Sequence, residues 1–138
     1  MLVVTVSGTP APQGSKRHVG NGRMIESSKA LKPWRKLVTD TVTANLGDWQ
    51  CTKDPIKLSI EFEITRPKAV ANPKRNTWRE HPTVKPDVDK LARAILDSLT
   101  GVVYHDDSQV IKLTVSKRYV EASPKTTIKA TNLMDMWN

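Results

Sequence analysis

Apolar and polar residues alternate along several stretches of the chain, and this two-residue period predicts β-strands. Residues 2–7 give a first strand. Residues 56–65 alternate without a fault and give the clearest strand, with one face buried and one face exposed to water. Residues 111–119 give a third strand, and residues 125–130 are expected to return as an edge strand after Pro124. The apolar side of the third strand consists of Ile111, Leu113, Val115 and Tyr119.

Two other stretches have the period of an amphipathic helix. The first runs from about Pro33 to Leu46, with Pro33 in its first turn and Gly47 as its stop. The second follows Pro86 and carries its buried stripe at Leu91, Ile95 and Leu99. The order strand, loop, helix, strand, loop, helix, strands predicts an α+β fold, an α/β sandwich in which about two main helices pack on a mixed β-sheet.

Two long segments lack periodicity, and both are basic. Residues 8–29 are rich in Gly and Pro, and Asn21-Gly22 predicts a hairpin turn within a short β-ribbon. Residues 66–86 combine six basic residues with Trp78, a composition suited to phosphate contacts and base stacking. In both segments the alternative is a solvated loop. The residues expected to contact nucleic acid are Lys16, Arg17, Arg66, Lys68, Lys74, Arg75, Arg79, Lys85 and Lys90.

Composition narrows the classes of partner. The 138 residues predict a single domain, residues 1–138. The net charge of +8 indicates a polyanion, nucleic acid before an anionic membrane surface, and no apolar run is long enough to cross a bilayer. The start of the chain is interpreted as a strand rather than a signal peptide. The single cysteine, Cys51, excludes an intrachain disulfide and fits a reducing cytoplasm.

Candidate chemistry is concentrated in two short acidic segments, residues 85–97 and 104–110. They hold five of the fourteen acidic residues: Asp87, Asp89, Asp97, Asp106 and Asp107. Asp87 and Asp89 precede the second helix, where either can be its N-cap, and Gly101 can close that helix. Asp106 and Asp107 form a turn after it. Carboxylate oxygens are the ligands that Mg²⁺ prefers, so the four aspartates are candidate metal ligands if the turn returns to the start of the helix.

Bland alternatives exist for each of these residues. One aspartate before the helix can be only an N-cap. Asp89, Arg93 and Asp97, spaced by four residues, can be surface ion pairs on the helix, worth about 0.3–0.5 kcal/mol each. The turn at 106–107 can be an ordinary turn.

The spacing Asp87-x-Asp89-x-Leu91-x-Arg93-x-x-x-Asp97-x-Leu99, followed by Asp106-Asp107-x-Gln109-Val110, resembles the signature of the RusA family of Holliday junction resolvases of bacteria and their phages. The resemblance is specific over about residues 85–110. It implies a cytoplasmic homodimer that binds four-way, branched double-stranded DNA and nicks two strands symmetrically with Mg²⁺ or Mn²⁺, without a small-molecule cofactor or a membrane. Carried over by position, Asp87, Asp89 and Asp107 are the essential metal-binding residues, and Asp97 and Asp106 support them.

Two positions depart from the family pattern. Lys90 stands where the family usually has Asn, and Arg93 where it usually has Lys. Arg93 cannot act as an acid or base, because arginine keeps its proton at working pH, but it can still clamp the scissile phosphate. Two alternatives to a junction resolvase therefore stay open. One is a non-catalytic protein that binds branched DNA, and the other is a metal-dependent nuclease for another nucleic-acid structure.

Overall fold

A four-stranded mixed sheet forms the centre of the protein, with strand order β1-β6-β4-β5. The computed structural model describes residues 1–14, 16–18, 24–26 and 29–135. Strands β4 and β5 are parallel, and the other neighbours are antiparallel, which confirms the predicted mixed sheet. The strands are β1 (Leu2–Ser7), β4 (Ile56–Thr65), β5 (Val110–Val120) and β6 (Lys125–Asn132).

The prediction that residues 125–130 form an edge strand is wrong. β6 lies between β1 and β4, and the side chains of Thr126, Ile128 and Ala130 are almost completely buried. The edges of the sheet are β1 and β5. The sequence misleads here because two of the three buried positions of β6, Thr126 and Ala130, are polar or small, yet two neighbouring strands flank them.

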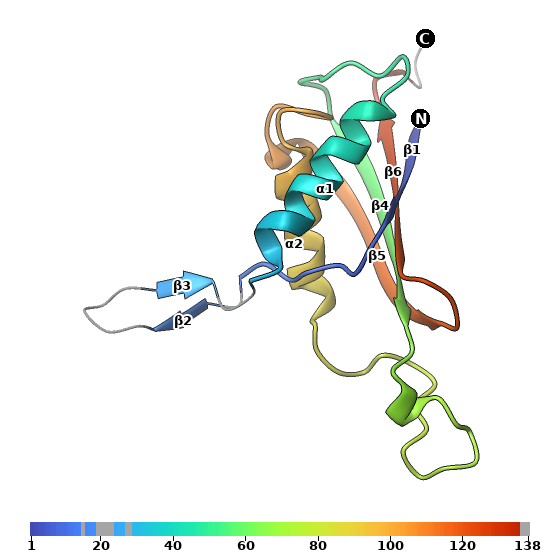
Figure 1. The fold of residues 1–138 in the computed structure, drawn as a ribbon. Coiled ribbons are helices and arrows are strands. Elements are labelled where there is room, and N and C mark those ends of the chain that lie inside the picture. The colour runs from blue at the N-terminus through green and yellow to red at the C-terminus, as the bar shows by residue number, and fades with distance from the viewer. Residues whose placement is uncertain (15, 19–23, 27–28, 136–138) are drawn as a thin grey trace.

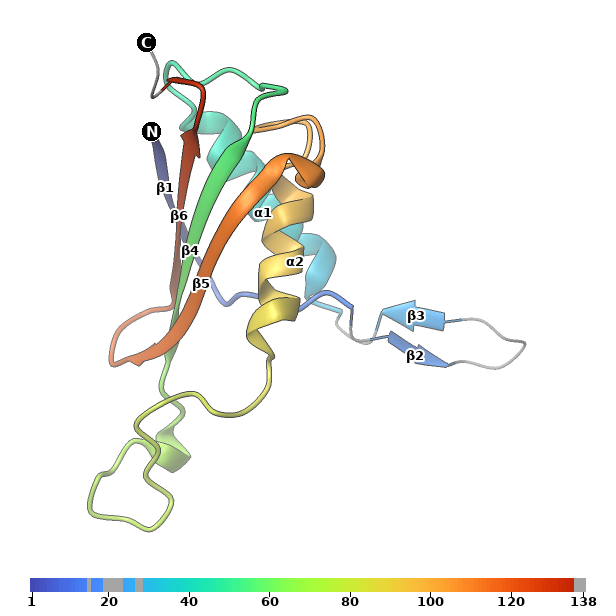
Figure 2. The same ribbon diagram turned by 180° about the vertical axis from the view of Figure 1, so that it is seen from behind.

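Two helices, α1 (Leu31–Ala44) and α2 (Val88–Leu99), pack side by side on one face of the sheet (Figures 1 and 2). This arrangement confirms the α+β sandwich. α1 begins two residues before the expected Pro33, which still lies in the first turn. α2 ends as predicted: Gly101 adopts a φ of +85°, and its N–H donates to the carbonyl of Tyr104 at 2.7 Å. None of the helices in the described parts of the chain is long and apolar enough to span a membrane.

The helices do not cover the whole apolar face. On β5, Ile111 is 68% exposed and Leu113 is 43% exposed, so the expectation that this side of the strand is buried holds only in part. Leu113 is in register with the fully buried Leu58 of β4, and therefore points to the side on which the helices pack. An apolar strip thus remains open along the outer edge of the sheet.

Two segments extend away from the body (Figure 1). Strands β2 (Lys16–His18) and β3 (Met24–Glu26) pair antiparallel, which confirms the predicted β-ribbon; the Asn21-Gly22 turn lies outside the described residues. The second extension comprises residues 66–86 and contains one short 3-10 helix, η1 (Lys68–Val70). The first residues of α2 lie between these two extensions (Figures 1 and 2).

Candidate functional site

The first acidic pair lies at the N-terminus of α2. Asp87 occupies the N-cap position, but its carboxylate makes no capping hydrogen bond and instead lies 3.6 Å from the ammonium of Lys90. Asp89 is exposed in the first turn. Negative charge is favourable at a helix N-terminus, so two aspartates at this end of α2 are compatible with the helix dipole. Because neither side chain is used as a cap, both remain accessible to a ligand.

The second acidic pair lies in the turn before β5, where η2 (Asp107–Gln109) forms one turn of 3-10 helix. The carboxylate of Asp106 accepts from the backbone N–H of Ser108 at 3.0 Å, and this hydrogen bond is the main reason that the pKa of Asp106 lies below its usual value. Asp106 is therefore the N-cap of η2, and its main observed role is structural.

The pKa of Asp107 is shifted in the opposite direction, above its usual value. Burial raises its pKa first, and the neighbouring carboxyl groups of Asp106 and Asp97 raise it further. The phenol of Tyr104, which is itself buried, donates to the carbonyl of Leu96 at 2.7 Å and fixes the turn against the C-terminal half of α2. A carboxyl group destabilised by negative neighbours is suited to receive a cation.

A single chain does not bring the two acidic pairs together, contrary to the expectation that the turn returns to the start of α2. Asp87 and Asp89 belong to the N-terminal end of α2. The short helix η2, which begins at Asp107, lies beside the C-terminal end of α2 (Figures 1 and 2). Leu99 is ten positions after Asp89, which corresponds to about 15 Å along the axis at 1.5 Å per residue. Among the described residues, no three His, Cys, Asp or Glu side chains form a group that could hold a metal ion.

The physical reason lies in the segment after the helix. Residues 101–105 form a tight turn, not a strand that travels back along α2, because Val103 and Tyr104 bury their side chains directly below the C-terminus of the helix. The chain returns toward the start of α2 only afterwards, as β5.

Gln109 holds the acidic turn in place. Its side-chain oxygen accepts from the N–H groups of His105 and Asp106, both at 2.8 Å, and its amide donates to the carbonyls of Thr52 and Asp54 at 2.8 and 2.9 Å. We expect Gln109→Ala to lower the free energy of unfolding by about 2 kcal/mol, because four hydrogen bonds to backbone groups are lost, two of them to half-buried carbonyls.

Urea denaturation followed by circular dichroism measures this loss. Gln50→Ala, which truncates an exposed glutamine elsewhere on the chain, is the matched control and is expected to unfold like the parent protein. Equal unfolding midpoints for Gln109→Ala and Gln50→Ala would contradict the assigned role of Gln109.

The loop after β1 crosses α2 and contains contacts that the sequence did not predict. The backbone N–H of Gln13 donates to the carbonyl of Lys90 at 2.9 Å, and its side-chain amide donates to the carboxylate of Asp97. Gly14 adopts a φ of +102°, and a Cβ at this position would lie 2.6 Å from Nη1 of Arg93. The glycine was the only signal of this close approach, and one glycine among several in a loop does not identify its neighbour.

The extension at residues 66–86 is fixed to the sheet by Arg66. The guanidinium of Arg66 lies 4.4 Å from the ring centre of Trp78 and 5.2 Å from that of Tyr119. It also pairs with Glu121 and donates to the carbonyl of Glu80 at 3.2 Å, and its side chain is only 11% exposed. Arg66 and Trp78 thus contact each other within the protein. The expected roles of Arg66 in phosphate contact and of Trp78 in base stacking stay predictions.

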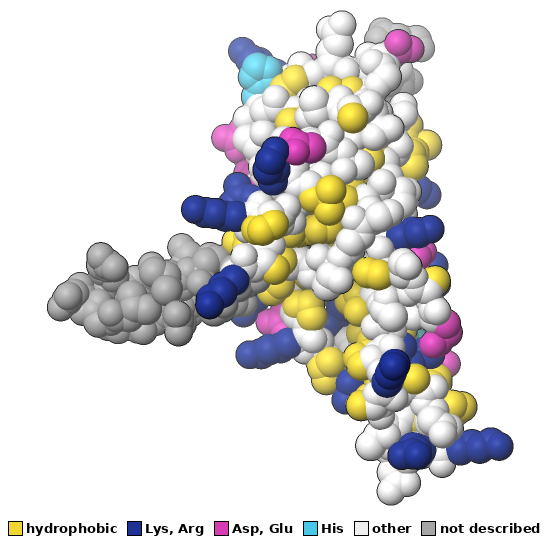
Figure 3. Space-filling view, in the orientation of Figure 1, with side chains coloured by type: hydrophobic (Ala, Val, Ile, Leu, Met, Phe, Trp, Pro, Cys, Tyr) yellow, Lys and Arg dark blue, Asp and Glu magenta, His cyan; other side chains and the backbone are white. Residues whose placement is uncertain are grey.

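The other end of the extension is fixed by Lys117 on β5. Its ammonium donates to the carbonyls of Val84 and Pro86 at 2.8 and 2.9 Å. An open hollow of about 930 Å³ lies here, bordered by Lys85, Asp87 and Asp89. Lys and Arg side chains are visible on the extension and on the adjoining body (Figure 3). The predicted nucleic-acid contacts that remain exposed on this extension are Lys68, Lys74, Arg75 and Lys85.

The other predicted contacts have different surroundings. Arg79 is half-buried and donates to the phenol oxygen of Tyr119 at 3.4 Å. Lys90 is half-buried beside Asp87. Lys16 and Arg17 lie on β2 of the ribbon. The two basic segments, the β2–β3 ribbon and the extension at residues 66–86, thus lie on two sides of the N-terminal end of α2 (Figures 1 and 2).

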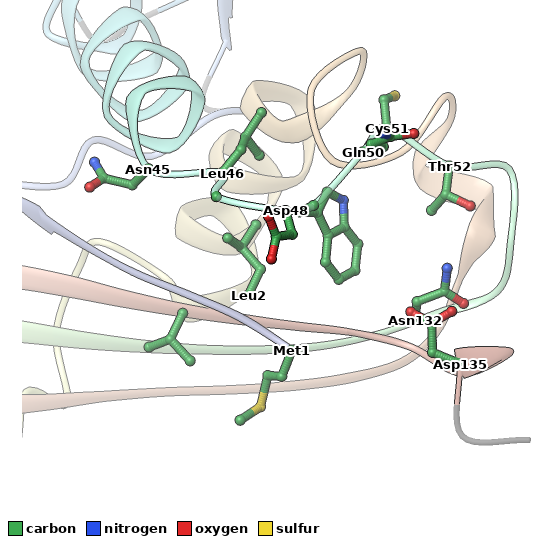
Figure 4. Close-up of a pocket in the computed structure, with 13 residues that line it drawn as sticks. Met1, Leu2, Asn45, Leu46, Asp48, Gln50, Cys51, Thr52, Asn132 and Asp135 are labelled. Carbon is green, nitrogen blue, oxygen red and sulfur yellow. The ribbon is translucent and has the colours of Figure 1, made fainter. Parts of the chain in front are cut away.

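A second hollow, of about 830 Å³, lies at the far end of the molecule, near the first residue and the end of α1 (Figure 4). Asp48, Cys51 and Asp135 line it, together with apolar and amide residues such as Leu46 and Asn132. No described residue of its lining is Lys or Arg, so it is poorly suited to phosphate. The α2 site is therefore the better candidate for binding a nucleic acid.

An exposed acidic pair at a helix N-terminus, set between two basic extensions, is the arrangement expected of a protein that acts on nucleic acid. The comparison with protein families agrees: residues 7–131 match the model described as endodeoxyribonuclease RusA, and the chain belongs to this family. It is similar to the uncharacterized protein YqaN of Bacillus subtilis (strain 168), with 32% identity over 123 residues that cover 85% of this chain and 87% of the relative. Family membership supports nuclease activity and DNA as the partner.

Proposed function

We propose that the protein is a Mg²⁺-dependent endonuclease that resolves Holliday junctions by paired, symmetric strand cleavage. Membership of the RusA family supports endonuclease activity at such junctions. The observation that carries the proposal for this chain is that Asp87 and Asp89 are exposed and that neither side chain caps α2. The start of this helix lies between the β2–β3 ribbon and the basic extension at 66–86 (Figure 1). We further propose that it acts in the cytoplasm of a bacterial or phage-infected cell.

The separation of the acidic pairs supports a site shared between two subunits. A two-fold axis perpendicular to α2, near its middle, exchanges the two ends of the helix between copies. Asp87 and Asp89 of one subunit then face Asp107 of the partner subunit, and the dimer contains two equivalent sites. Two sites related by a two-fold axis are what symmetric cleavage of two strands requires.

The outer edge of β5 is the surface that we propose for this dimer. Within the described residues β5 has a neighbour only on the β4 side, and an open strand edge readily pairs with another chain. Ile111 and Leu113 on β5, and Val84 and Val88 at the entrance to α2, are exposed on or near this edge. Antiparallel association of two β5 edges would cover apolar surface and place the opposite ends of two α2 helices side by side.

The carboxylates fit a hard divalent cation in their chemistry, but within one described chain they do not converge. In the proposed dimer, the cation would be held by Asp87 and Asp89 of one subunit together with Asp107 of the partner subunit. A bound Mg²⁺ supplies an activated water and neutralises charge at the phosphate. The exposed guanidinium of Arg93, one turn after Asp89, binds the scissile phosphate, and the basic extensions hold the arms of the junction.

One contact favours the non-catalytic alternative. Lys90, where the family usually has Asn, lies 3.6 Å from the carboxylate of Asp87 and partly satisfies the charge that a cation would otherwise satisfy. If this pair persists on DNA, the protein binds branched DNA without cutting it. Both side chains are partly exposed, so the pair is worth about 1 kcal/mol or less, and a divalent cation with additional ligands is expected to displace it.

The test is cleavage of synthetic four-way junctions in Mg²⁺, in Mn²⁺ and in EDTA, at one fixed salt concentration. We expect paired nicks in the junction with either metal and none in EDTA. Duplex, flapped DNA and RNA are the comparison substrates, because a basic protein binds every nucleic acid at low salt. Tight junction binding without product would support the non-catalytic alternative, and preferred cleavage of a flap or of RNA would support a nuclease of another specificity.

A further inference from the structure

The loop of residues 9–14 lies across one face of α2 and reaches three of its charged residues. Ala11 is buried in the core, and the backbone of Gln13 is hydrogen-bonded to Lys90. Lys90, Arg93 and Asp97 share one face of α2, because seven residues make nearly two full turns. The loop therefore spans about two turns of the helix that begins at the acidic pair.

Asp97 and Arg93 have the spacing of an ion pair, yet they do not form one. They are four positions apart in the sequence, the spacing at which opposite charges on a helix surface are neighbours and can pair. Among the residues that the structure describes, no carboxylate pairs with Arg93. Instead the carboxylate of Asp97 accepts from the side-chain amide of Gln13, and the guanidinium of Arg93 lies against Gly14.

We propose that Gln13 is a positioning residue: by occupying the carboxylate of Asp97, it prevents that group from neutralising Arg93, and leaves the guanidinium free to bind a DNA phosphate. Gly14 completes the arrangement, since a Cβ there would lie 2.6 Å from Nη1 of Arg93 and the end of the arginine side chain would have to move. Gln13 does not touch DNA itself; it acts through Asp97 and Arg93. The inference rests on the proposed function only in taking a DNA phosphate as the partner of Arg93.

The arrangement has a cost that a purely structural contact would not need. The side-chain oxygen of Gln13 is buried and has no hydrogen-bond partner in the described parts of the molecule. A hydrocarbon side chain could fill the same space without leaving a buried acceptor unsatisfied. The amide therefore has a purpose beyond filling space, which is its donation to Asp97.

The first experiment measures junction affinity without metal, as a function of salt concentration, for the full-length protein and Gln13→Ala. Once Gln13 is removed, Asp97 is free to pair with Arg93, and one phosphate contact is lost. We expect affinity to fall about tenfold, the effect of one charged hydrogen bond. The slope of log K against log salt concentration is expected to become shallower by about 0.9, the contribution of one neutralised phosphate.

The decisive variant is the double substitution Gln13→Ala with Asp97→Asn. It removes the carboxylate that captures Arg93, so its affinity and salt slope are expected to equal those of the single variant Asp97→Asn, which has lost the same negative charge near the DNA. A contact that acts other than through Asp97 gives a different result, because Gln13→Ala then weakens binding in the Asp97→Asn background as well. Affinity that is lower in the double variant than in Asp97→Asn, or that does not fall in Gln13→Ala, overturns the inference.

Two controls separate this inference from the proposed function. Arg93→Ala tests the phosphate contact itself: if it binds junctions as tightly as the parent protein, the phosphate role of Arg93 in the proposed function fails. If Arg93→Ala weakens binding and Gln13→Ala does not, only the role of Gln13 fails. Gln50→Ala is the matched glutamine control, and circular dichroism with thermal unfolding verifies that every variant is folded.

Discussion

Asp89→Asn and Asp107→Asn are each expected to abolish junction cleavage in Mg²⁺ while junction binding persists. Each substitution keeps the size of the side chain and removes one negative charge from the proposed cation site. Loss of one group that stabilises charge in an active site lowers the rate about 10²–10³-fold. Binding is expected to stay the same or to tighten, because the protein loses negative charge near a polyanion. Nicking rates and gel-shift affinities measure the two effects separately.

A mixture of the two variants distinguishes a shared site from a site within one chain. In a mixed dimer with shared sites, one site carries both substitutions and the other carries none. Refolding the two variants together is therefore expected to restore nicking of one strand, although each variant alone is inactive. With sites contained in single chains, each site carries one substitution and the mixture stays inactive.

The control for this experiment is Asp48→Asn, which changes an exposed carboxylate at the far end of the molecule and is expected to leave cleavage unchanged. An inactive mixture, with mixed dimers verified by a tag on one variant, would refute the shared site. Full cleavage by Asp89→Asn alone would refute the metal role of this residue.

Ile111→Asp is expected to convert the protein to a monomer and to lower junction cleavage by at least about a hundredfold. Ile111 is mostly exposed in one chain, so the substitution is expected to change the free energy of unfolding by only about 0.5 kcal/mol. In the proposed dimer the same carboxylate would be buried against a second β5 edge without a partner, which is strongly unfavourable. Analytical ultracentrifugation and the nicking assay measure the two results.

Val3→Asp is the matched control for the interface. Like Ile111, Val3 is an exposed β-branched residue on an edge strand, but it lies on β1, at the opposite edge of the sheet. It is expected to leave both the dimer and the cleavage rate unchanged. A dimeric Ile111→Asp, or a Val3→Asp that becomes a monomer, would show that the β5 edge is not the interface.

Local sequence determined most of the secondary structure. The unbroken alternation of residues 56–65 defines β4, because only a strand places such residues on one buried and one exposed face. The stripe at Leu91, Ile95 and Leu99 and the glycine at 101 determine α2 and its end. The spacing of aspartates around this helix also indicated the family, because that pattern depends on neighbouring residues along the chain.

Tertiary structure alone decided which of these residues meet. The burial of Val103 and Tyr104 keeps Asp107 at the far end of α2 from Asp89, which no spacing in the sequence reveals. Arg66 is hidden against Trp78, and Asp97 is taken by Gln13, 84 positions away in the chain. Hydrophobic periodicity reports the face on which a residue lies, but the partner of a charged side chain depends on which distant segment packs against that face.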